Sequence, residues 1–210
     1  MALRAVIFDY GMVLTGPQEP EALAALLRIT GLGQERFHSL YWADRHAYDE
    51  GKLTGVEFWE KFISEAGLEL GPDAVAELND WDARLWTTEN VEMLRWQECL
   101  MTAGLKTAIL SNMGDAVLAR IEREVGWIKR FDLQVWSSQL LVAKPDSRIY
   151  THTLNLLGVE PAEVLFLDDR LVNIVAARAL GMQGFVFSTV EQLRVDLVAT
   201  GLDRELPLPA

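Results

Sequence analysis

The segment A-V-I-F-D-Y-G-M-V-L, residues 5–14, decides how the rest of the chain can be arranged. Its first four residues are apolar and rich in β-branched and aromatic side chains, and Asp9 follows them directly. A continuous apolar run of this length is typical of a strand buried on both faces, as in a parallel sheet. We therefore expect residues 5–8 to form a central strand, with Asp9 at its carboxyl end.

Four further segments have the character of this strand. They cover residues 107–110, 133–136, 164–167 and 184–187, of which 133–136 is the weakest. Amphipathic helical patterns lie between them, as in residues 149–157, which Gly158 ends, and in residues 171–180, which Gly181 ends. This alternation of strands and helices predicts an α/β fold with a doubly wound, Rossmann-like parallel sheet.

Residues 15–89 interrupt the alternation. They contain no convincing buried strand, but helical patterns recur in residues 20–29, 34–48, 54–66 and 72–85. A helical block that follows the first strand of an α/β domain is best explained as an inserted subdomain. We expect an α/β core of residues 1–14 and 90–210, and a helical cap of residues 15–89.

The charge balance limits the partners. The chain has 31 acidic and 19 basic residues, a net charge of −12, and residues 15–89 carry −9 of it. Nucleic acids and anionic membranes bind through clustered Lys and Arg, so we expect neither as a partner. A phosphorylated small molecule remains compatible, because local charge governs phosphate binding in a desolvated site.

Cysteine usage and hydropathy indicate the compartment. The single cysteine, Cys99, cannot form an internal disulfide, and no apolar run approaches the ~20 residues of a membrane span. The N-terminal residues lack the pattern of a signal peptide. We expect a cytoplasmic protein, monomeric or homodimeric, in which Cys99 is an inert core residue of the apolar stretch 91–103.

Polar side chains follow the expected strands where their carboxyl ends meet. They are Asp9, Ser111, Asn112, Asp168 and Asp169, with Lys144 in the loop after residues 133–136. Ligands of open parallel sheets bind at this edge, and clustered carboxylates favour Mg²⁺ over zinc. Taken singly, each residue has an ordinary explanation as a helix cap, a turn or a loop residue. Together they favour a site that handles phosphate.

Four motifs, in order, resemble those of the haloacid dehalogenase-like (HAD) hydrolase superfamily. They are A-V-I-F-D-Y-G-M-V-L around Asp9, A-I-L-S-N ending at Asn112, V-A-K-P-D-S-R-I-Y around Lys144, and V-L-F-L-D-D-R-L-V-N ending at Asn173. The resemblance covers the chain except the insert, which lies where that family has its helical C1 cap. It implies a Mg²⁺-dependent phosphatase of a small phosphorylated metabolite, with Asp9 as the nucleophile that becomes an aspartyl phosphate.

The resemblance also implies roles for the other residues. Ser111, Asn112 and Lys144 would bind the phosphoryl group, and Ser111 and Lys144 would share in catalysis. Mg²⁺ would be held by Asp9, Asp168, Asp169, Asn173 and the backbone carbonyl of Gly11. Arg45 and His46, on the expected cap, are candidates for contact with the substrate. Packing within an amphipathic helical bundle is at least as good an explanation of both.

Gly11 departs from the family pattern, which commonly has a second aspartate at this place as general acid and base. A positioned acid contributes about 10²–10⁴-fold to the rate. We therefore expect good leaving groups, as in anomeric sugar phosphates or acyl phosphates, to be hydrolysed better than simple alkyl phosphates.

Two alternatives stay open. A haloacid dehalogenase would use the same Asp9 to displace halide from carbon, but that branch needs no metal and lacks the pair Asp168 and Asp169. A non-catalytic HAD-like protein that binds a phospho-metabolite is suggested by Gly11, although Asp9, Lys144 and the acidic pair are all present.

Overall fold

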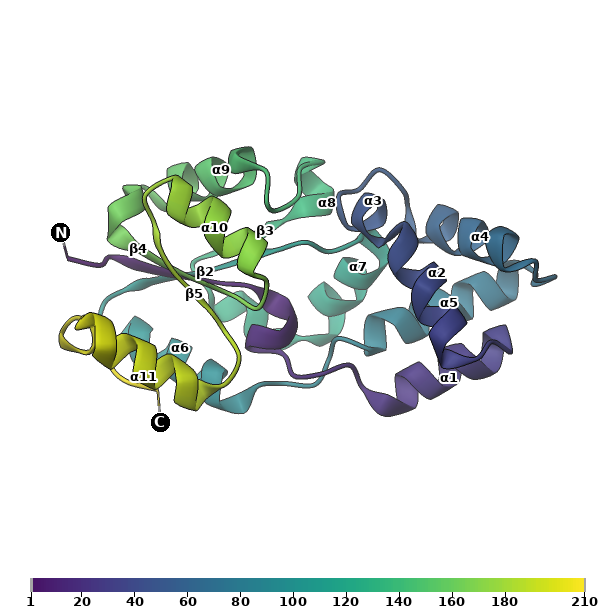
Figure 1. The fold of residues 1–210 in the computed structure, drawn as a ribbon, viewed down its shortest axis with the longest axis horizontal. Helices are drawn as coiled ribbons and strands as arrows, with labels where there is room; N and C mark the ends of the chain where they lie inside the picture. Colours follow the sequence, from purple (N-terminus) through teal and green to yellow (C-terminus); the bar gives the residue numbers. More distant parts are fainter. Residues whose placement is uncertain (1, 210) are drawn as a thin grey trace.

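A computed structural model describes residues 2–209, which form a five-stranded parallel sheet covered by helices and a helical block beyond one end of it (Figure 1). The strand order is β3-β2-β1-β4-β5. The strands are β1 (Ala5–Phe8), β2 (Lys106–Ser111), β3 (Leu133–Trp136), β4 (Val164–Asp168) and β5 (Gln183–Val186). The predicted doubly wound α/β fold is confirmed, and β5 begins one residue earlier than expected.

Alternate residues of β1 face the two sides of the sheet, and each side is covered by its own helices. Val6 and Phe8 belong to one buried cluster with residues of α6 (Val91–Thr102), α7 (Asp115–Glu124) and α11 (Val190–Thr200). Ala5 and Ile7 pack with α9 (Ser147–Leu157) and α10 (Leu171–Ala179). Because both faces are buried, the strand had to be apolar at every position, as its sequence is.

The register brings the carboxyl ends of the central strands together. Phe8 is paired with Ile109 of β2 and Leu167 of β4, and the Asp9 amide donates to the Leu167 carbonyl at 2.8 Å. The residues that follow these strands therefore meet at one edge of the sheet, facing the helical block.

The helical block contains five helices. They are α1 (Pro20–Thr30), α2 (Gln34–Ala43), α3 (Arg45–Asp49), α4 (Gly55–Ala66) and α5 (Pro72–Arg84). The helix expected over residues 34–48 is two helices, because Asp44 between them has a non-helical backbone with φ −112° and ψ 5°. An aromatic cluster of Phe37, Tyr41, Phe58 and Trp59 forms the interior of the block.

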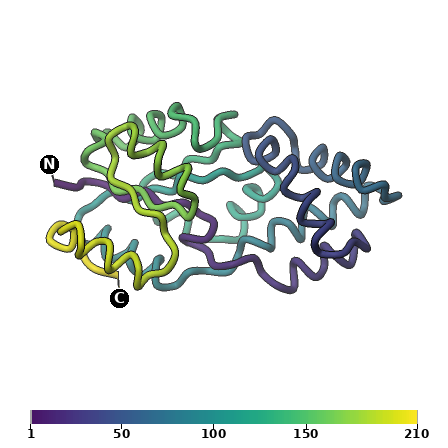
Figure 2. The backbone as a smooth tube through the Cα atoms, viewed as in Figure 1, coloured from purple at the N-terminus to yellow at the C-terminus, as the bar shows by residue number. Residues whose placement is uncertain are grey.

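The chain enters and leaves the block through two adjacent segments. Thr15 and Glu89 form an antiparallel bridge, the Gly16 amide donates to the Thr88 carbonyl at 2.8 Å, and the Asn90 amide donates to the Leu14 carbonyl at 3.0 Å. Both ends of the chain lie at the opposite end of the molecule from the block (Figure 2). The bridge and the two hydrogen bonds hold together the segments through which the chain enters and leaves the block.

Further contacts hold the block against the sheet part. Helix α5 packs on α7, and the amide of Gly55 donates to the Asp115 carboxylate at 2.8 Å. The Ser137 hydroxyl binds the Asp49 carbonyl and accepts from the Met113 amide at 2.9 Å. The block is therefore fixed to the loop that follows β2.

Cys99 corrects one expectation, because its side chain is exposed on α6 and not part of the core. The buried face of this helix is made by Met93, Trp96 and Leu100, and Cys99 lies outside that stripe. Within residues 2–209, no helix combines the length and the apolar character needed to cross a bilayer.

Replacing Gly114 with Ala tests the contact between block and sheet part. The added methyl group would overlap the ring of Tyr48, so we expect Gly114→Ala to lower the free energy of unfolding by about 1–3 kcal/mol. Urea denaturation measures the change. Gly126→Ala is the control, since a methyl group there meets nothing within 4 Å. Equal stability of the two variants would contradict this packing.

Candidate active site

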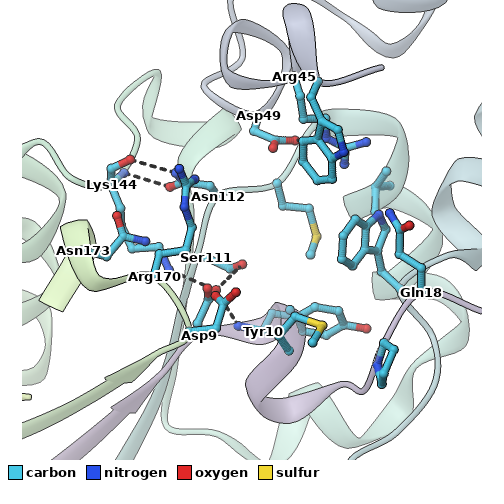
Figure 3. Close-up of a pocket in the computed structure, with 18 of the residues that line it drawn as sticks. Asp9, Tyr10, Gln18, Arg45, Asp49, Ser111, Asn112, Lys144, Arg170 and Asn173 are labelled. Carbon is cyan, nitrogen blue, oxygen red and sulfur yellow. Dashed lines mark hydrogen bonds and ion pairs between the residues drawn. The ribbon is translucent and has the colours of Figure 1, made fainter. Parts of the chain in front are cut away.

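A cavity of about 590 Å³ lies between the carboxyl edge of the sheet and the helical block (Figure 3). We call the side of the cavity at the sheet the floor, and the side at the helical block the roof. The floor consists of Asp9, Ser111, Asn112, Lys144, Asp169, Arg170 and Asn173. The roof consists of His38, Trp42, Arg45 and Asp49. Residues far apart in the chain thus line one cavity of a volume typical for small-molecule sites.

Lys144 is the buried centre of the floor, with its side chain only 1% exposed. Its ammonium group lies 3.0 Å from Asp9 Oδ1 and 2.7 Å from Asp168 Oδ2, and donates to the Leu110 carbonyl at 2.8 Å. Burial would lower the pKa of Lys144, but Asp168 and Asp9 raise it above its ordinary value. The lysine therefore stays charged and joins the ends of β1, β2 and β4.

Asp9 has one oxygen held and one free. Oδ1 accepts from the Tyr10 amide at 2.7 Å and the Ser111 hydroxyl at 2.8 Å, besides its contact with Lys144. Within residues 2–209, Oδ2 accepts no hydrogen bond, and Asp9 lines the cavity. Such an arrangement orients a carboxylate and leaves one oxygen able to react.

The pKa of Asp9 is raised from 3.8 to about 7, and burial is the main cause. Lys144 opposes this shift, while the negative charges of Asp168 and Asp169 add to it. The three carboxylates outnumber the Lys144 ammonium group and the exposed Arg170 guanidinium group, so the floor has excess negative charge. A bound cation would favour the ionised form of Asp9 by offsetting that excess.

Asp168 is fully occupied by protein donors. Oδ1 accepts from the Arg170 amide at 2.8 Å, and the Asn173 side chain donates to both oxygens at 2.9 and 3.0 Å. Burial opposes the ionisation of Asp168, but Lys144 and these donors lower its pKa below 3.8. The geometry makes Asp168 a permanent anion that positions Lys144.

The donor set fits a hard divalent cation. Carboxylate oxygens of Asp9, Asp168 and Asp169 lie within 4.8 Å of one another, and no histidine or cysteine belongs to this group of described residues. The Asn173 side-chain oxygen is buried without a hydrogen-bond partner beside them. Oxygen-only sites with several carboxylates suit Mg²⁺. Since Asp168 is engaged, Asp9 and Asp169 are the freest carboxylates.

Asn112 binds the protein chain through its side chain. Its Nδ2 donates to the Lys144 carbonyl at 2.9 Å, and the Lys144 amide donates to its Oδ1 at 2.8 Å. This pair of hydrogen bonds fixes the Lys144 loop to the end of β2 (Figure 3). The side chain of Asn112 thus positions Lys144, and a phosphate contact through the rest of the residue stays a prediction.

Gly11 lies at the cavity in a backbone conformation that any residue can adopt, with φ −66° and ψ 137°. A Cβ atom there would meet the Trp86 ring at 3.8 Å, an ordinary contact. The neighbouring Met12 has φ 60°, which is rare for a residue with a side chain, and also lines the cavity. Trp86 thus stands beside the place where the family commonly has a carboxylate.

The structure places Arg45 and His46 differently. Arg45 is buried at the roof and forms ion pairs with Asp49 at 2.9 Å and with Asp82 at 2.9 Å. The His46 side chain is 66% exposed beside Glu50 and does not line the cavity. Successive residues of an α-helix are rotated by about 100° about its axis, so His46 points to the solvent where Arg45, the residue before it in α3, points to the cavity. We therefore withdraw His46 as a substrate contact.

Sequence reasoning missed Asp49 and Trp86, both of which line the cavity. Asp49 had a recognisable signal, because it lies four residues after Arg45 and opposite charges at this spacing face each other on a helix. Trp86 had none, since its place at the cavity depends on how α5 ends.

A family model described as haloacid dehalogenase-like hydrolase matches residues 3–181. The chain belongs to this family. The family prediction made from the four motifs is confirmed, and so is the prediction that the protein is a hydrolase. The assignment of the helical block to the C1 cap type stays a prediction.

Relatives of this HAD-like hydrolase include enzymes of more than one activity. A phosphatase of Mycobacterium tuberculosis is 30% identical over 202 residues, which cover 94% of this chain and 93% of the relative. Bifunctional epoxide hydrolase 2 of Rattus norvegicus is 34% identical over 100% of this chain. The match spans only 41% of that longer protein.

Two solved structures share the fold of this HAD-like hydrolase. A HAD family enzyme of Bacteroides thetaiotaomicron, in complex with magnesium and inorganic phosphate, has a TM-score of 0.72 at 18% identity, covering 89% of this chain and 94% of that one. L-2-haloacid dehalogenase of Xanthobacter autotrophicus, with chloropropionic acid covalently bound, has a TM-score of 0.65 at 22% identity, covering 94% and 83%. At these identities the similarity extends to the fold alone.

Replacing Lys144 with Met tests the buried ion pairs. In a solution free of divalent cations at pH 7, we expect Lys144→Met to lower the free energy of unfolding by about 3–5 kcal/mol, because Asp9 and Asp168 lose the ammonium group that pairs with them. Without Lys144 the folded-state pKa of both carboxyls rises, so protonation relieves the variant as the pH falls from 7 to 5. The deficit should shrink over this window mainly through Asp168, because the lowered pKa of Asp168 keeps it ionised in the parent protein down to pH 5. Asp9, with a pKa of about 7, takes up its proton by pH 5 in the parent protein as well, so it contributes less to the change.

Urea denaturation at pH 7 and pH 5 measures this deficit, and exposed Lys129→Met serves as the control. A deficit no larger than that of the control, or one that grows on acidification, would refute the pairing.

Proposed function

We propose that this HAD-like hydrolase is a Mg²⁺-dependent phosphatase that cleaves a small phosphorylated metabolite through an aspartyl phosphate on Asp9. The carrying observation is the Asp9 carboxylate, which has Oδ1 held by three donors while Oδ2 has no partner within residues 2–209. A fixed carboxylate with one free oxygen is what a covalent mechanism requires.

The reaction would take place in two displacements. In the first, Asp9 Oδ2 forms a bond to phosphorus while the bond from phosphorus to the leaving oxygen breaks, and the leaving group takes that electron pair. In the second, water attacks phosphorus, the bond to Asp9 breaks with its electron pair returning to the carboxylate, and inorganic phosphate is released. The protons of both steps exchange with solvent, because Gly11 provides no carboxylate.

The charges on the floor support phosphoryl transfer. The Ser111 hydroxyl and the Lys144 ammonium group both contact Asp9, and they can stabilise phosphoryl oxygens brought to that carboxylate. Asp9 and Asp169, with the Gly11 carbonyl and the Asn173 side-chain oxygen as further candidates, would hold Mg²⁺. When bound, the cation would neutralise phosphoryl charge and keep Asp9 ionised.

The phosphatase of Mycobacterium tuberculosis supports this reaction class, because it matches almost the whole length of both chains. The acidic pair Asp168 and Asp169 favours it over the displacement of halide, which uses the same nucleophile without a metal. Asp9 and Lys144 also argue against a protein that only binds a phospho-metabolite.

Replacing Asp9 with Asn tests the nucleophile. With Mg²⁺ present we expect phosphate release from acetyl phosphate or an aryl phosphate to fall at least about 10⁴-fold, since an amide cannot form the covalent intermediate. EDTA should abolish the activity of the parent protein, and Mg²⁺ should restore it. Exposed Asp203→Asn is the control and should keep the parent rate. Full activity of Asp9→Asn, or halide release from 2-chloropropionate in EDTA, would overturn the proposal.

Replacing Gly11 with Asp tests the missing acid. The backbone at Gly11 accepts a side chain, and the nearest atoms belong to the Trp86 ring. We expect the parent protein to hydrolyse acyl and aryl phosphates relatively faster than alkyl phosphates. In Gly11→Asp the ratio of the aryl phosphate rate to the alkyl phosphate rate should fall by up to about 10²-fold. Rates across a series of leaving-group pKa values measure this, and a flat profile in the parent protein would contradict it.

A further inference from the structure

Arg45 has an unused donor group at the roof. The residue is 5% exposed, its Nε donates to Asp49 at 2.9 Å, and its Nη1 donates to both oxygens of Asp82 at 2.9 and 3.0 Å. Nη2 makes no hydrogen bond within residues 2–209 and is not sealed off from open space. Because Arg45 lines the cavity, the two N–H groups of Nη2 are available to a molecule inside it.

The guanidinium group is held rigidly. Its central carbon lies 4.9 Å from the centre of the Tyr41 ring and 5.1 Å from the centre of the Tyr48 ring. The Tyr41 hydroxyl also donates to Asp82 at 2.6 Å. A donor that is already oriented loses little conformational entropy on binding, so it can discriminate between ligands.

Asp49 provides an acceptor next to this donor. Its Oδ1 accepts from Arg45 Nε, and no other side chain within residues 2–209 donates to this carboxylate, which lines the cavity. Burial raises the pKa of Asp49 to about 6, although Arg45 and the backbone amide of Gly114 oppose the shift, so the group is mostly ionised at pH 7 and has acceptor capacity left. Its backbone carbonyl is bound by Ser137, which in turn accepts from the amide of Met113 on the floor side. The donor and acceptor of the roof are therefore held in place relative to the floor, and Figure 3 shows Arg45 and Asp49 side by side across the cavity from Asp9.

The roof has no positive charge left for an anion. Arg45 already faces two carboxylates, Asp49 and Asp82, so these three groups together carry a net charge of −1. The remaining Lys and Arg side chains that line the cavity, Lys144 and Arg170, belong to the floor. A second anionic group at the roof would be desolvated without compensation, whereas a hydroxyl can accept from Nη2 and donate to Asp49.

Apolar side chains line much of the space between floor and roof. They are Met12, Leu23, Trp42, Trp86, Met113 and Val117. A leaving group that crosses this space gains from burying apolar surface, at roughly 25 cal/mol per Å². A leaving group that is charged or carries many hydroxyl groups would lose its hydrogen bonds to water there, and the apolar side chains offer none in exchange.

We propose that Arg45 Nη2 and Asp49 determine specificity, by selecting phosphomonoesters whose leaving group has an apolar body and a neutral hydroxyl or amide at its far end. This inference rests on the proposed phosphatase function and names its substrate class. The phosphoryl group binds the floor, the apolar body lies along the cavity walls, and the distal group exchanges two hydrogen bonds with the roof. Substrates with a second anion at that end are disfavoured.

Phenyl phosphates with a tail at the 4-position test this assignment. The tails have three to six methylene groups and end in a methyl, a hydroxyl or a carboxylate group. The phenol leaving group is the same throughout, so differences in kcat/KM report on the tail end. At the tail length that reaches the roof, we expect the hydroxyl compound to exceed the methyl and carboxylate compounds by about 10-fold.

Three variants separate recognition from structure. Arg45→Lys keeps a charge for Asp82 but lacks the second amino group, so the hydroxyl-to-methyl ratio should fall toward one. Asp49→Asn removes a negative charge from the roof, so discrimination against the carboxylate tail should weaken. His46→Gln, on the exposed side of the same helix, should keep the parent ratios. A purely structural defect would lower kcat/KM for all three substrates by the same factor and leave the ratios between them unchanged.

Binding is measured in parallel, as the shift in Tm caused by nonhydrolysable phosphonates with the same tails. If Arg45→Lys does not fold, Asp49→Asn alone decides: both its kcat/KM values and its Tm shifts must then show weaker discrimination against the carboxylate tail than those of the parent protein. Hydrolysis with equal kcat/KM and equal Tm shifts for all tails would overturn the roof assignment and leave the phosphatase function intact. Tail-dependent Tm shifts without hydrolysis would overturn the function and support the roof. Neither turnover nor any shift would overturn both.

Discussion

The buried contact of Lys144 with Asp9 and Asp168 is the constraint on which the rest of the site depends. It joins the carboxyl ends of β1, β2 and β4, and each carboxylate would be costly to bury without that ammonium group. Asn112 fixes the lysine's backbone, while Asn173 and the Arg170 amide fix Asp168. The result is one oriented carboxylate oxygen on Asp9 in a surplus of negative charge, which suits a divalent cation and a phosphoryl group.

The helical block completes the site by closing the space above this floor. Its own interior is aromatic, and within that interior Arg45 is buried between two carboxylates and two tyrosine rings. The Ser137 hydroxyl connects the block to the loop after β2, so the polar groups of the roof and the nucleophile of the floor belong to one connected framework. The acidic character of the block acts locally, by leaving the roof without a free positive charge.

Much of the fold could be predicted from local patterns. Doubly buried strands require continuous apolar runs, and helix ends such as Gly158, with φ +65°, require a residue without a side chain. The expectations that failed concern single faces of helices. Cys99 and His46 lie in helices that were correctly predicted, but their exposure depends on which stripe of the helix the neighbouring elements cover. Asp44 similarly divides a helical pattern that is continuous in the sequence.

By itself, the sequence determined the α/β fold, the family and the residues that gather at the floor, because a parallel sheet brings its carboxyl ends to one edge and four motifs mark those ends. Only the tertiary structure decided what each residue does there. In the structure the Asn112 side chain hydrogen-bonds the backbone of Lys144, and the Asn173 side chain hydrogen-bonds Asp168. Asp9 Oδ2 has no partner within residues 2–209, and Arg45 pairs with Asp49 at the roof. Hydrogen-bond partners depend on side-chain directions across distant segments, and no local pattern encodes those directions.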